Sequence, residues 1–245
     1  MLKCLLWDVD GTLADTERDG HRVAFNKAFD EAAIERHWDI PTYGKLLEVT
    51  GGKERIKTDF GDKLSTQEIA QLHARKTFFY QELIQHGHIP LRAGVQRLLE
   101  EAKDAGLILG VVTTTTPSAL EALVVHTLGE AWLKTFAVMA AGDIVPAKKP
   151  APDIYDYALN ALGLNASDCL AIEDSYNGVM SATQAGIKTL ITINDYTAKQ
   201  DFSTAELVVS ELGEPDRKAI TIYHNPHQLK AHHISLQDCH ALFQK

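Results

Sequence analysis

The sequence predicts an α/β protein built on a doubly wound parallel sheet, with a helical insertion after the first strand. Short apolar runs rich in β-branched residues alternate with helical patterns through the second half of the chain. Strand–helix–strand alternation at this spacing requires right-handed crossovers between parallel strands. Between the first such run and the others lies a charged stretch whose apolar residues recur only at helical spacing, which predicts the insertion.

A strand that is buried on both faces of a sheet is expected to be a continuous apolar run. On this basis the strands are placed at 3–9, 107–114, 136–143, 169–175, 189–195 and 207–212. The helices between them are placed at 94–105, 117–129, 151–163 and 177–186. These elements assign residues 1–15 and 90–215 to a discontinuous core, residues 16–89 to the helical insertion and residues 216–245 to a C-terminal extension of unknown role.

The composition is that of a soluble globular protein. With 245 residues, 45% of them hydrophobic and 23% charged, the chain has enough apolar material for a sizeable core. No apolar run approaches the ~20 residues that span a bilayer. The first residues lead into a strand without the features of a signal peptide. We therefore expect a cytoplasmic protein with no membrane partner.

The net charge and the cysteines further limit the kinds of partner and of cysteine chemistry that this protein can have. A formal net charge of −9 argues against nucleic acid as a partner. An anionic substrate would therefore need a local metal ion or basic cluster to hold it. Cys4, Cys169 and Cys239 are far apart in sequence and are expected to be free thiols. Cys4 and Cys169 lie in apolar strand-like runs and are expected to be buried. We also expect a monomer.

Acidic residues end two of the predicted strands. Asp8 and Asp10 close the first strand, where alternate residues point to the same side, and Glu173 and Asp174 close a later one. Ligands of such sheets bind beyond the carboxyl ends of the strands, so the four carboxylates should converge. Like charges this close are costly unless a cation lies between them, and oxygen ligands suit Mg²⁺. All four are candidate ligands, with Asp174 on the metal directly or through water and Glu173 farther out.

Two further features point to phosphoryl transfer through an aspartate nucleophile. Thr113 begins a run of hydroxyls at the end of the second predicted strand, and Lys149 precedes a predicted helix. Asp8 would attack phosphorus and form an aspartyl-phosphate, while Asp10 would protonate the leaving oxygen and later deprotonate water. Lys149 and Mg²⁺ would neutralise charge on the transferring group, and Thr113 would hydrogen-bond to it.

These four pieces resemble the four motifs of the haloacid dehalogenase-like (HAD) phosphotransferases: DxDGT at residues 8–12, a terminal Ser/Thr on the second strand, a lysine and an acidic pair. The resemblance implies a HAD-like Rossmannoid core. Asp10 disfavours the dehalogenase branch, because the phosphotransferring members use that residue as acid and base. The helical insertion resembles the small α-helical cap that closes over the site in the subgroup containing β-phosphoglucomutase.

A closer resemblance is to the CbbY group, which is associated with dephosphorylation of xylulose-1,5-bisphosphate. The stretches that carry it are 50–56, 73–77, 113–116, 140–143 and 148–155. The resemblance implies that cap residues grip the second phosphate of such a substrate. By this resemblance Lys53, Arg55, His73 and Lys76 would grip the substrate, and Glu17 and His21 would contact it or tie the cap to the core. The other substrate-binding residues are Gly51, Gly52 and Thr114. The chain departs from the group after about Pro215.

The expected function is Mg²⁺-dependent hydrolysis of a sugar phosphate, with xylulose-1,5-bisphosphate as the expected substrate. Closure of the cap would expel water, with hinges near 14–16 and 86–92. A phosphosugar mutase of the β-phosphoglucomutase type is the alternative, because it uses the same motifs. A non-catalytic sugar-phosphate sensor is a second alternative, but its signature would be a damaged motif, and all four motifs are intact here.

Overall fold

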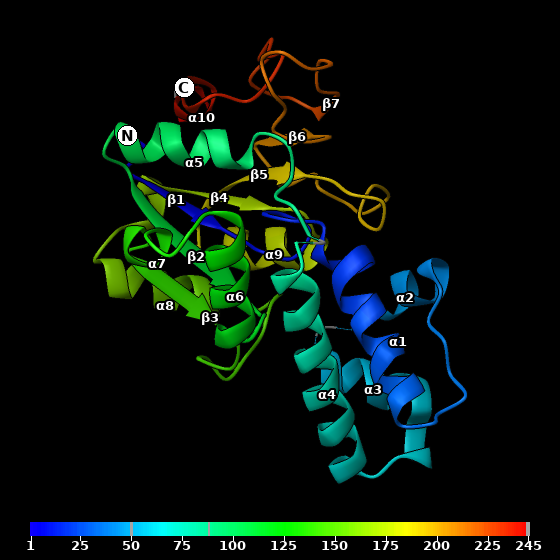
Figure 1. The fold of residues 1–245 in the computed structure, drawn as a ribbon. Helices are drawn as coiled ribbons and strands as arrows, with labels where there is room; N and C mark the ends of the chain where they lie inside the picture. Colours follow the sequence, from blue (N-terminus) through cyan, green and yellow to red (C-terminus); the bar gives the residue numbers. More distant parts are fainter. Residues whose placement is uncertain (50, 88, 244–245) are drawn as a thin grey trace.

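The computed structural model describes residues 1–49, 51–87 and 89–243, and a seven-stranded sheet lies at its centre (Figure 1). Thr50 of the 50–56 stretch, His88 of a predicted hinge and residues 244–245 of the C-terminal extension lie outside the described residues. The strand order is β3-β2-β1-β4-β5-β6-β7. The strands are β1 (Cys4–Trp7), β2 (Ile108–Thr113), β3 (Val138–Ala141), β4 (Cys169–Glu173), β5 (Lys188–Thr192), β6 (Leu207–Val209) and β7 (Ile222–His224).

The predicted doubly wound α/β fold is confirmed. Strands β1 to β6 coincide with the six apolar runs, and every pair of neighbours among them is parallel. The strand order reverses at β1 and β4, which lie side by side with Trp7 opposite Ile172. Such a reversal leaves a crevice beyond the carboxyl ends of the two strands. The acidic residues that follow β1 and end β4 therefore meet at this crevice.

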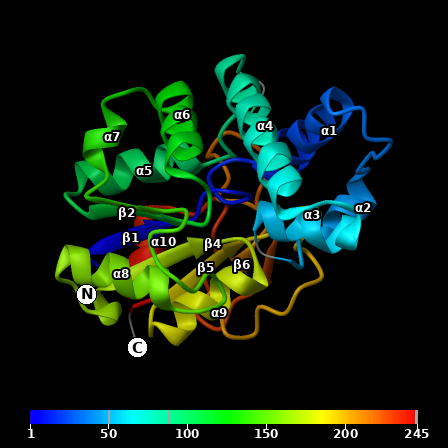
Figure 2. The same ribbon diagram turned by 90° about the horizontal axis from the view of Figure 1, so that it is seen from below.

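Helices cover both faces of the sheet, as Figure 2 shows. Alternate residues of a strand point to opposite faces, so Leu5 and Trp7 pack on one side of β1, and Cys4 and Leu6 pack on the other. This is why β1 is apolar throughout. One face carries α5 (Val95–Asp104), α6 (Pro117–Thr127) and α7 (Trp132–Thr135), and the other carries α8 (Asp153–Leu162) and α9 (Tyr176–Gln184).

The segment between β1 and α5 is helical in its described part and lies beside the sheet at the carboxyl ends of the strands (Figures 1 and 2). It has a small core of its own, in which Phe25, Phe29 and Tyr43 pack around Trp38. A capping box between Ser65 and Glu68 starts its longest helix. A π-helical turn (Glu17–His21) leads into α1 (Arg22–Glu31), α2 (Ile40–Leu46), α3 (Gly52–Phe60), a 3₁₀ turn (Gly61–Lys63) and α4 (Thr66–Gln85).

The C-terminal segment completes the core, which the sequence did not predict. Strand β7 pairs antiparallel with β6, and α10 (Leu236–Ala241) packs near α5. Ile234, Cys239 and Leu242 are buried in the same apolar cluster as the residues of α5. The segment thus closes one end of the sheet and covers part of one face.

Two smaller expectations concern thiols and membranes. Cys4, Cys169 and Cys239 are free, and Cys4 and Cys169 are buried, as predicted; Cys239 is buried as well. Among the described residues no helix has both the length and the apolar character needed to cross a membrane.

Candidate active site

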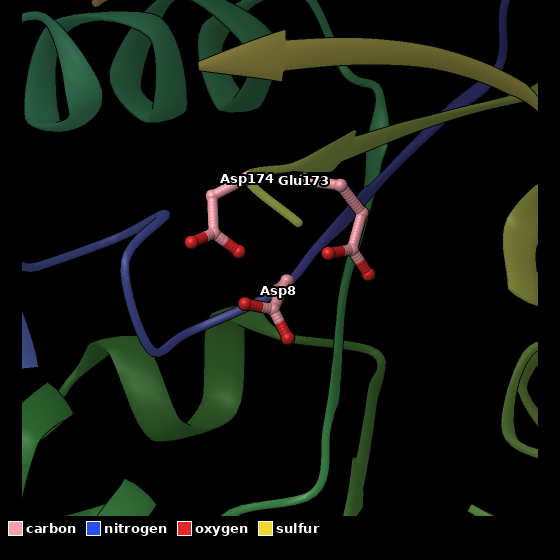
Figure 3. A group of neighbouring side chains, drawn as sticks. All are labelled: Asp8, Glu173 and Asp174. Atoms are coloured by element: carbon pink, nitrogen blue, oxygen red, sulfur yellow. The ribbon is translucent and has the colours of Figure 1, made fainter. Parts of the chain in front are cut away.

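Three buried carboxylates meet where the strand order reverses. Asp8 follows β1, Glu173 ends β4 and Asp174 follows it, and one oxygen from each lies within 4.8 Å of the others. Figure 3 shows the three side chains around a common space. Asp8 is held in place by its backbone N–H, which donates to the carbonyl of Ile172 at 3.0 Å. The parallel pairing of β1 and β4 therefore fixes the spacing of the acids.

Lys149 lies between two of these carboxylates. Its Nζ donates to Asp8 Oδ1 at 2.7 Å, to Glu173 Oε1 at 2.5 Å and to the carbonyl of Val112 at 2.9 Å. The Tyr155 hydroxyl also donates to Glu173 Oε1, at 2.6 Å. Burial alone would lower the pKa of Lys149, but the charges of Asp8 and Glu173 raise it instead. Lys149 is therefore a permanent cation, and one oxygen of Glu173 is fully engaged.

The remaining acids repel one another. Burial, followed by the charge of Glu173, raises the pKa of Asp8 well above its usual value, although Lys149 opposes the rise. Burial and Glu173 likewise raise the pKa of Asp174 to about 8. The Asn194 amide donates to Asp174 Oδ2 at 2.6 Å. Carboxylates that are costly to ionise in this way create a demand for a further cation.

A glycine is required next to Asp174. Gly11 has a φ of 88°, and any Cβ at this position would overlap the Asp174 carboxylate and contact the Asn194 amide. The Gly of the DxDGT motif therefore has a steric function, because it lets the first loop approach the second acidic pair.

Asp10 is held by a different set of groups. Its Oδ1 accepts from Thr16 Oγ1 at 2.6 Å and from His21 Nε2 at 2.8 Å, and its Oδ2 accepts from Thr115 Oγ1. Lys76 Nζ lies 2.7 Å from His21 Nδ1. An ammonium can only donate, so His21 accepts at Nδ1 and donates from Nε2. Burial opposes ionisation of Asp10, but His21, Thr115 and Thr16 outweigh it and hold the pKa of Asp10 well below its usual value.

Glu17 and Arg55 form a second network beside Asp10. The Tyr43 hydroxyl donates to Glu17 Oε2 at 2.5 Å and accepts from Arg55 Nη1 at 3.1 Å. Arg55 Nη2 lies 3.5 Å from Glu17 Oε1. Because Tyr43 is fully buried in the small core of the insertion, the two charged side chains are fixed relative to α2 and α3.

Two adjoining cavities open on these groups. The larger, of about 380 Å³, is lined by Asp8, Asp10 and Asp174 together with Lys149. The smaller, of about 70 Å³, is lined by basic side chains and backbone of the insertion, namely His21, Gly51, Gly52, His73 and Lys76. Asp10, Glu17, Arg55 and Thr114 line both. The site thus combines an acidic compartment with a second one, called here the cationic compartment, in which Arg55 and Lys76 lie beside Asp10 and Glu17.

The structure brings most of the predicted site residues to these cavities. Thr113 ends β2 and is buried, with its Oγ1 accepting from the Thr115 N–H at 3.1 Å. Three of the predicted residues, Thr113, Glu173 and Lys53, line neither cavity, and Lys53 is exposed. Asp10 lines both cavities, but its carboxylate lies outside the group of three acids.

Several polar side chains of the site were not predicted from the sequence. Thr115 lies in the predicted hydroxyl run and Asn194 follows β5 at the same edge, so their positions at strand ends were usable signals. Thr16, Tyr43 and Tyr155 carry no such signal, because only the packing of the helices brings them to the acids.

The chain is similar to known proteins over most of its length. The haloacid dehalogenase-like hydrolase family model matches residues 2–186. The chain is 46% identical to protein CbbY of Cupriavidus necator over 223 residues, which cover 87% of each chain. A mutant of CbbY from Rhodobacter sphaeroides, solved in complex with xylulose-1,5-bisphosphate, is 39% identical, with a TM-score of 0.82 over 86% of this chain and 95% of that one. A β-phosphoglucomutase from Clostridium difficile, 21% identical, shares the fold with a TM-score of 0.69 over 85% of this chain and 91% of that one.

Proposed function

Because the chain belongs to the haloacid dehalogenase-like hydrolase family, we propose that it is a Mg²⁺-dependent phosphatase of sugar bisphosphates, with xylulose-1,5-bisphosphate as its substrate. The observation that carries this proposal is the pair of adjoining cavities, one acidic with a buried lysine and the other cationic. A substrate with two phosphates would place one in each. The complex of the CbbY relative with this bisphosphate supports the choice of sugar.

The acidic compartment fits Mg²⁺. Asp8 and Asp174 each have an oxygen that makes no hydrogen bond to Lys149 or Asn194, and hard oxygen ligands suit this ion. Glu173 is engaged by Lys149 and Tyr155, so it would hold the lysine and contact the ion through water. The Asp10 carboxylate lies outside this group, and both of its oxygens already accept hydrogen bonds. Bound Mg²⁺ would neutralise charge on the transferring phosphoryl group.

Asp8 and Asp10 would perform the chemistry in two steps. An oxygen of Asp8 attacks phosphorus, and the bond to the sugar oxygen breaks as the new bond forms. Asp10 gives its proton to that sugar oxygen. Water then attacks the aspartyl-phosphate and passes a proton back to Asp10, which releases phosphate and regenerates Asp8. Lys149 holds the Asp8 oxygen in place, and Thr113 would hydrogen-bond to the phosphoryl group.

The three hydrogen bonds to Asp10 favour its carboxylate, which is the form that accepts a proton from water. The acid step needs a proton at the same oxygens. His21 Nε2–H, 2.8 Å away, can supply it only if Lys76 passes a proton to His21 Nδ1 at the same time, which keeps the imidazole neutral. His21 and Thr16 both belong to the start of the insertion. Asp10 therefore accepts these hydrogen bonds only when the insertion lies over the site. This links the proton transfers of Asp10 to closure of the cap.

The cationic compartment would bind the distal phosphate. Lys76 and Arg55 supply charge there, although burial lowers the pKa of Lys76 to about 8 against the opposing charges of Glu17 and Asp10. Burial and Lys76 lower the pKa of His73 to about 4, so His73 contributes a neutral hydrogen-bonding ring. A monophosphate would leave this compartment unfilled and would gain nothing from it.

Phosphate release from a panel of sugar mono- and bisphosphates, with Mg²⁺ or with EDTA, tests the proposal. We expect Mg²⁺-dependent release from ketopentose 1,5-bisphosphates and little from monophosphates, and we expect Asp8→Asn to abolish turnover while the protein stays folded. Slow release together with migration of phosphate between positions of one hexose would identify a mutase instead. Binding of the bisphosphate without turnover by the unaltered protein would identify a sensor.

A further inference from the structure

Arg92 is a buried guanidinium outside the groups assigned to the chemistry. Its side chain is 9% exposed, and Nε lies 3.3 Å from Asp15 Oδ1. Its two terminal nitrogens donate to backbone carbonyls of three separate segments. The acceptors are the carbonyls of Gly11, Thr192 at 3.0 Å, Ile193 at 2.5 Å and Ser210 at 3.2 Å, together with Thr192 Oγ1 at 3.1 Å.

Two of these acceptors belong to the loops that contact Asp174. Gly11 packs directly against the Asp174 carboxylate, and Ile193 precedes Asn194, whose amide donates to the same carboxylate. The loop after β1 and the loop after β5 share no backbone hydrogen bond in the described residues. Arg92 therefore joins the two backbones that support Asp174 from either side.

The backbone of Arg92 lies where the chain returns from the insertion to the core (Figure 1). Its N–H donates to the carbonyl of Leu13 at 2.8 Å, and Leu91 forms an antiparallel bridge with Ala14. The outgoing and returning connections thus lie side by side, and Arg92 fastens both to the ends of β5 and β6.

We propose that Arg92 is a positioning residue for the metal site, which holds the Gly11 and Asn194 loops so that Asp174 presents its carboxylate to Mg²⁺. The inference rests on the proposed metal-dependent function. A planar guanidinium with five N–H donors can serve acceptors from several directions at once, whereas an ammonium has only three donors at a single point. Lysine should therefore not replace arginine here, even though the charge is kept.

The test measures Mg²⁺ binding directly by calorimetry, alongside thermal unfolding, for Arg92→Lys and Arg92→Met. Loss of a group that orients a metal ligand weakens metal affinity by about 10- to 100-fold. We expect weakening of this order in both variants. A residue that acts only on the metal site should also raise the Mg²⁺ concentration needed for half-maximal activity more than it raises the KM of the bisphosphate.

Arg97 offers a matched control. It too is largely buried, donates to the carbonyls of Gly213 and Ile234 at 2.9 Å, and pairs with Glu101 and Glu214, but none of these partners belongs to the loops that contact Asp174. Arg97→Lys should lower the unfolding temperature and leave Mg²⁺ affinity unchanged. Equal weakening of Mg²⁺ binding in the Arg97 variant would overturn the proposal, because the effect would then be general destabilisation.

Two further outcomes are decisive. Wild-type Mg²⁺ affinity in Arg92→Lys would show that charge alone is sufficient and would refute a role for the forked geometry. If the Arg92 variants do not fold, Asn194→Ala can replace them, because it removes the hydrogen bond through which the Arg92-held loop contacts Asp174. This variant should weaken Mg²⁺ binding to a similar degree. Unchanged Mg²⁺ affinity in Asn194→Ala refutes the inference. Failure of the unaltered protein to bind Mg²⁺ would instead refute both this inference and the proposed function.

Discussion

Replacing Lys149 with methionine should destabilise the protein strongly and in a pH-dependent way. The methionine side chain is unbranched like that of lysine and one atom shorter, and it removes all three donations from Nζ, two of them to the buried carboxylates of Asp8 and Glu173. Removing one partner of a buried ion pair typically costs about 3–5 kcal/mol, because the charge left behind has no compensation. We expect a loss of this size at about pH 8.

The loss should be smaller at low pH. Without Lys149, Asp8 loses the nearby cation that opposes the rise of its pKa, so the native state of the variant retains a proton that the unfolded chain releases. A native state that binds more protons than the unfolded state becomes less stable as pH rises. The difference in unfolding free energy between variant and wild type should therefore grow from about pH 5 to about pH 8.

Urea unfolding in EDTA at these two pH values measures the effect. Lys148→Met is the matched control, because Lys148 is partly exposed and pairs with Asp143, which is 81% exposed. Such surface pairs contribute at most about 1 kcal/mol. If Lys149→Met costs no more than Lys148→Met, or costs the same at both pH values, then Lys149 is not the compensating charge of the acidic cluster.

Three further predictions concern other parts of the molecule. The Lys76 ammonium loses its proton above about pH 8, so the KM for a bisphosphate should rise by up to about tenfold per pH unit above that pH. This rise of KM with pH should be absent in Lys76→Met. If the variant still shows it, the titrating group is a different residue. A Cβ at Gly178 would overlap the Glu173 carboxylate, so Gly178→Ala should cost about 1–3 kcal/mol in urea unfolding and also lower kcat; unaltered kcat would refute a role for the placement of Glu173. Leu242 is fully buried, so Leu242→Ala should cost about 2–5 kcal/mol of stability with kcat unchanged below the unfolding transition; a neutral variant would mean that the C-terminal segment does not contribute to the core.

The sheet and the convergence of its acids were predictable because both follow from local patterns. Strands β1 to β6 are apolar runs long enough to recognise, and parallel pairing places their carboxyl ends at one edge. Asp8, Glu173 and Asp174 could therefore be placed together without knowledge of any side-chain contact.

The groups that hold these acids could not be placed in the same way. His21 and Lys76 are 55 positions apart and meet only because the π-helical turn that ends at His21 packs against α4, so no spacing rule connects them. Strand β7 has three residues and α10 has six, and elements this short are stabilised by their neighbours more than by their own propensity. The contact between Leu242 and the core could likewise not be read from the chain alone.

The pairing of β7 with β6 also bears on how the protein is made. Residues 222–243 leave the ribosome after every residue that lines the two cavities. Until they emerge, the backbone of β6 is an open edge and the α5 face beneath Cys239 and Leu242 is uncovered. Unpaired edges and bare apolar faces are where nascent chains associate wrongly. A nascent chain can therefore have its whole catalytic apparatus translated while it is still vulnerable to aggregation.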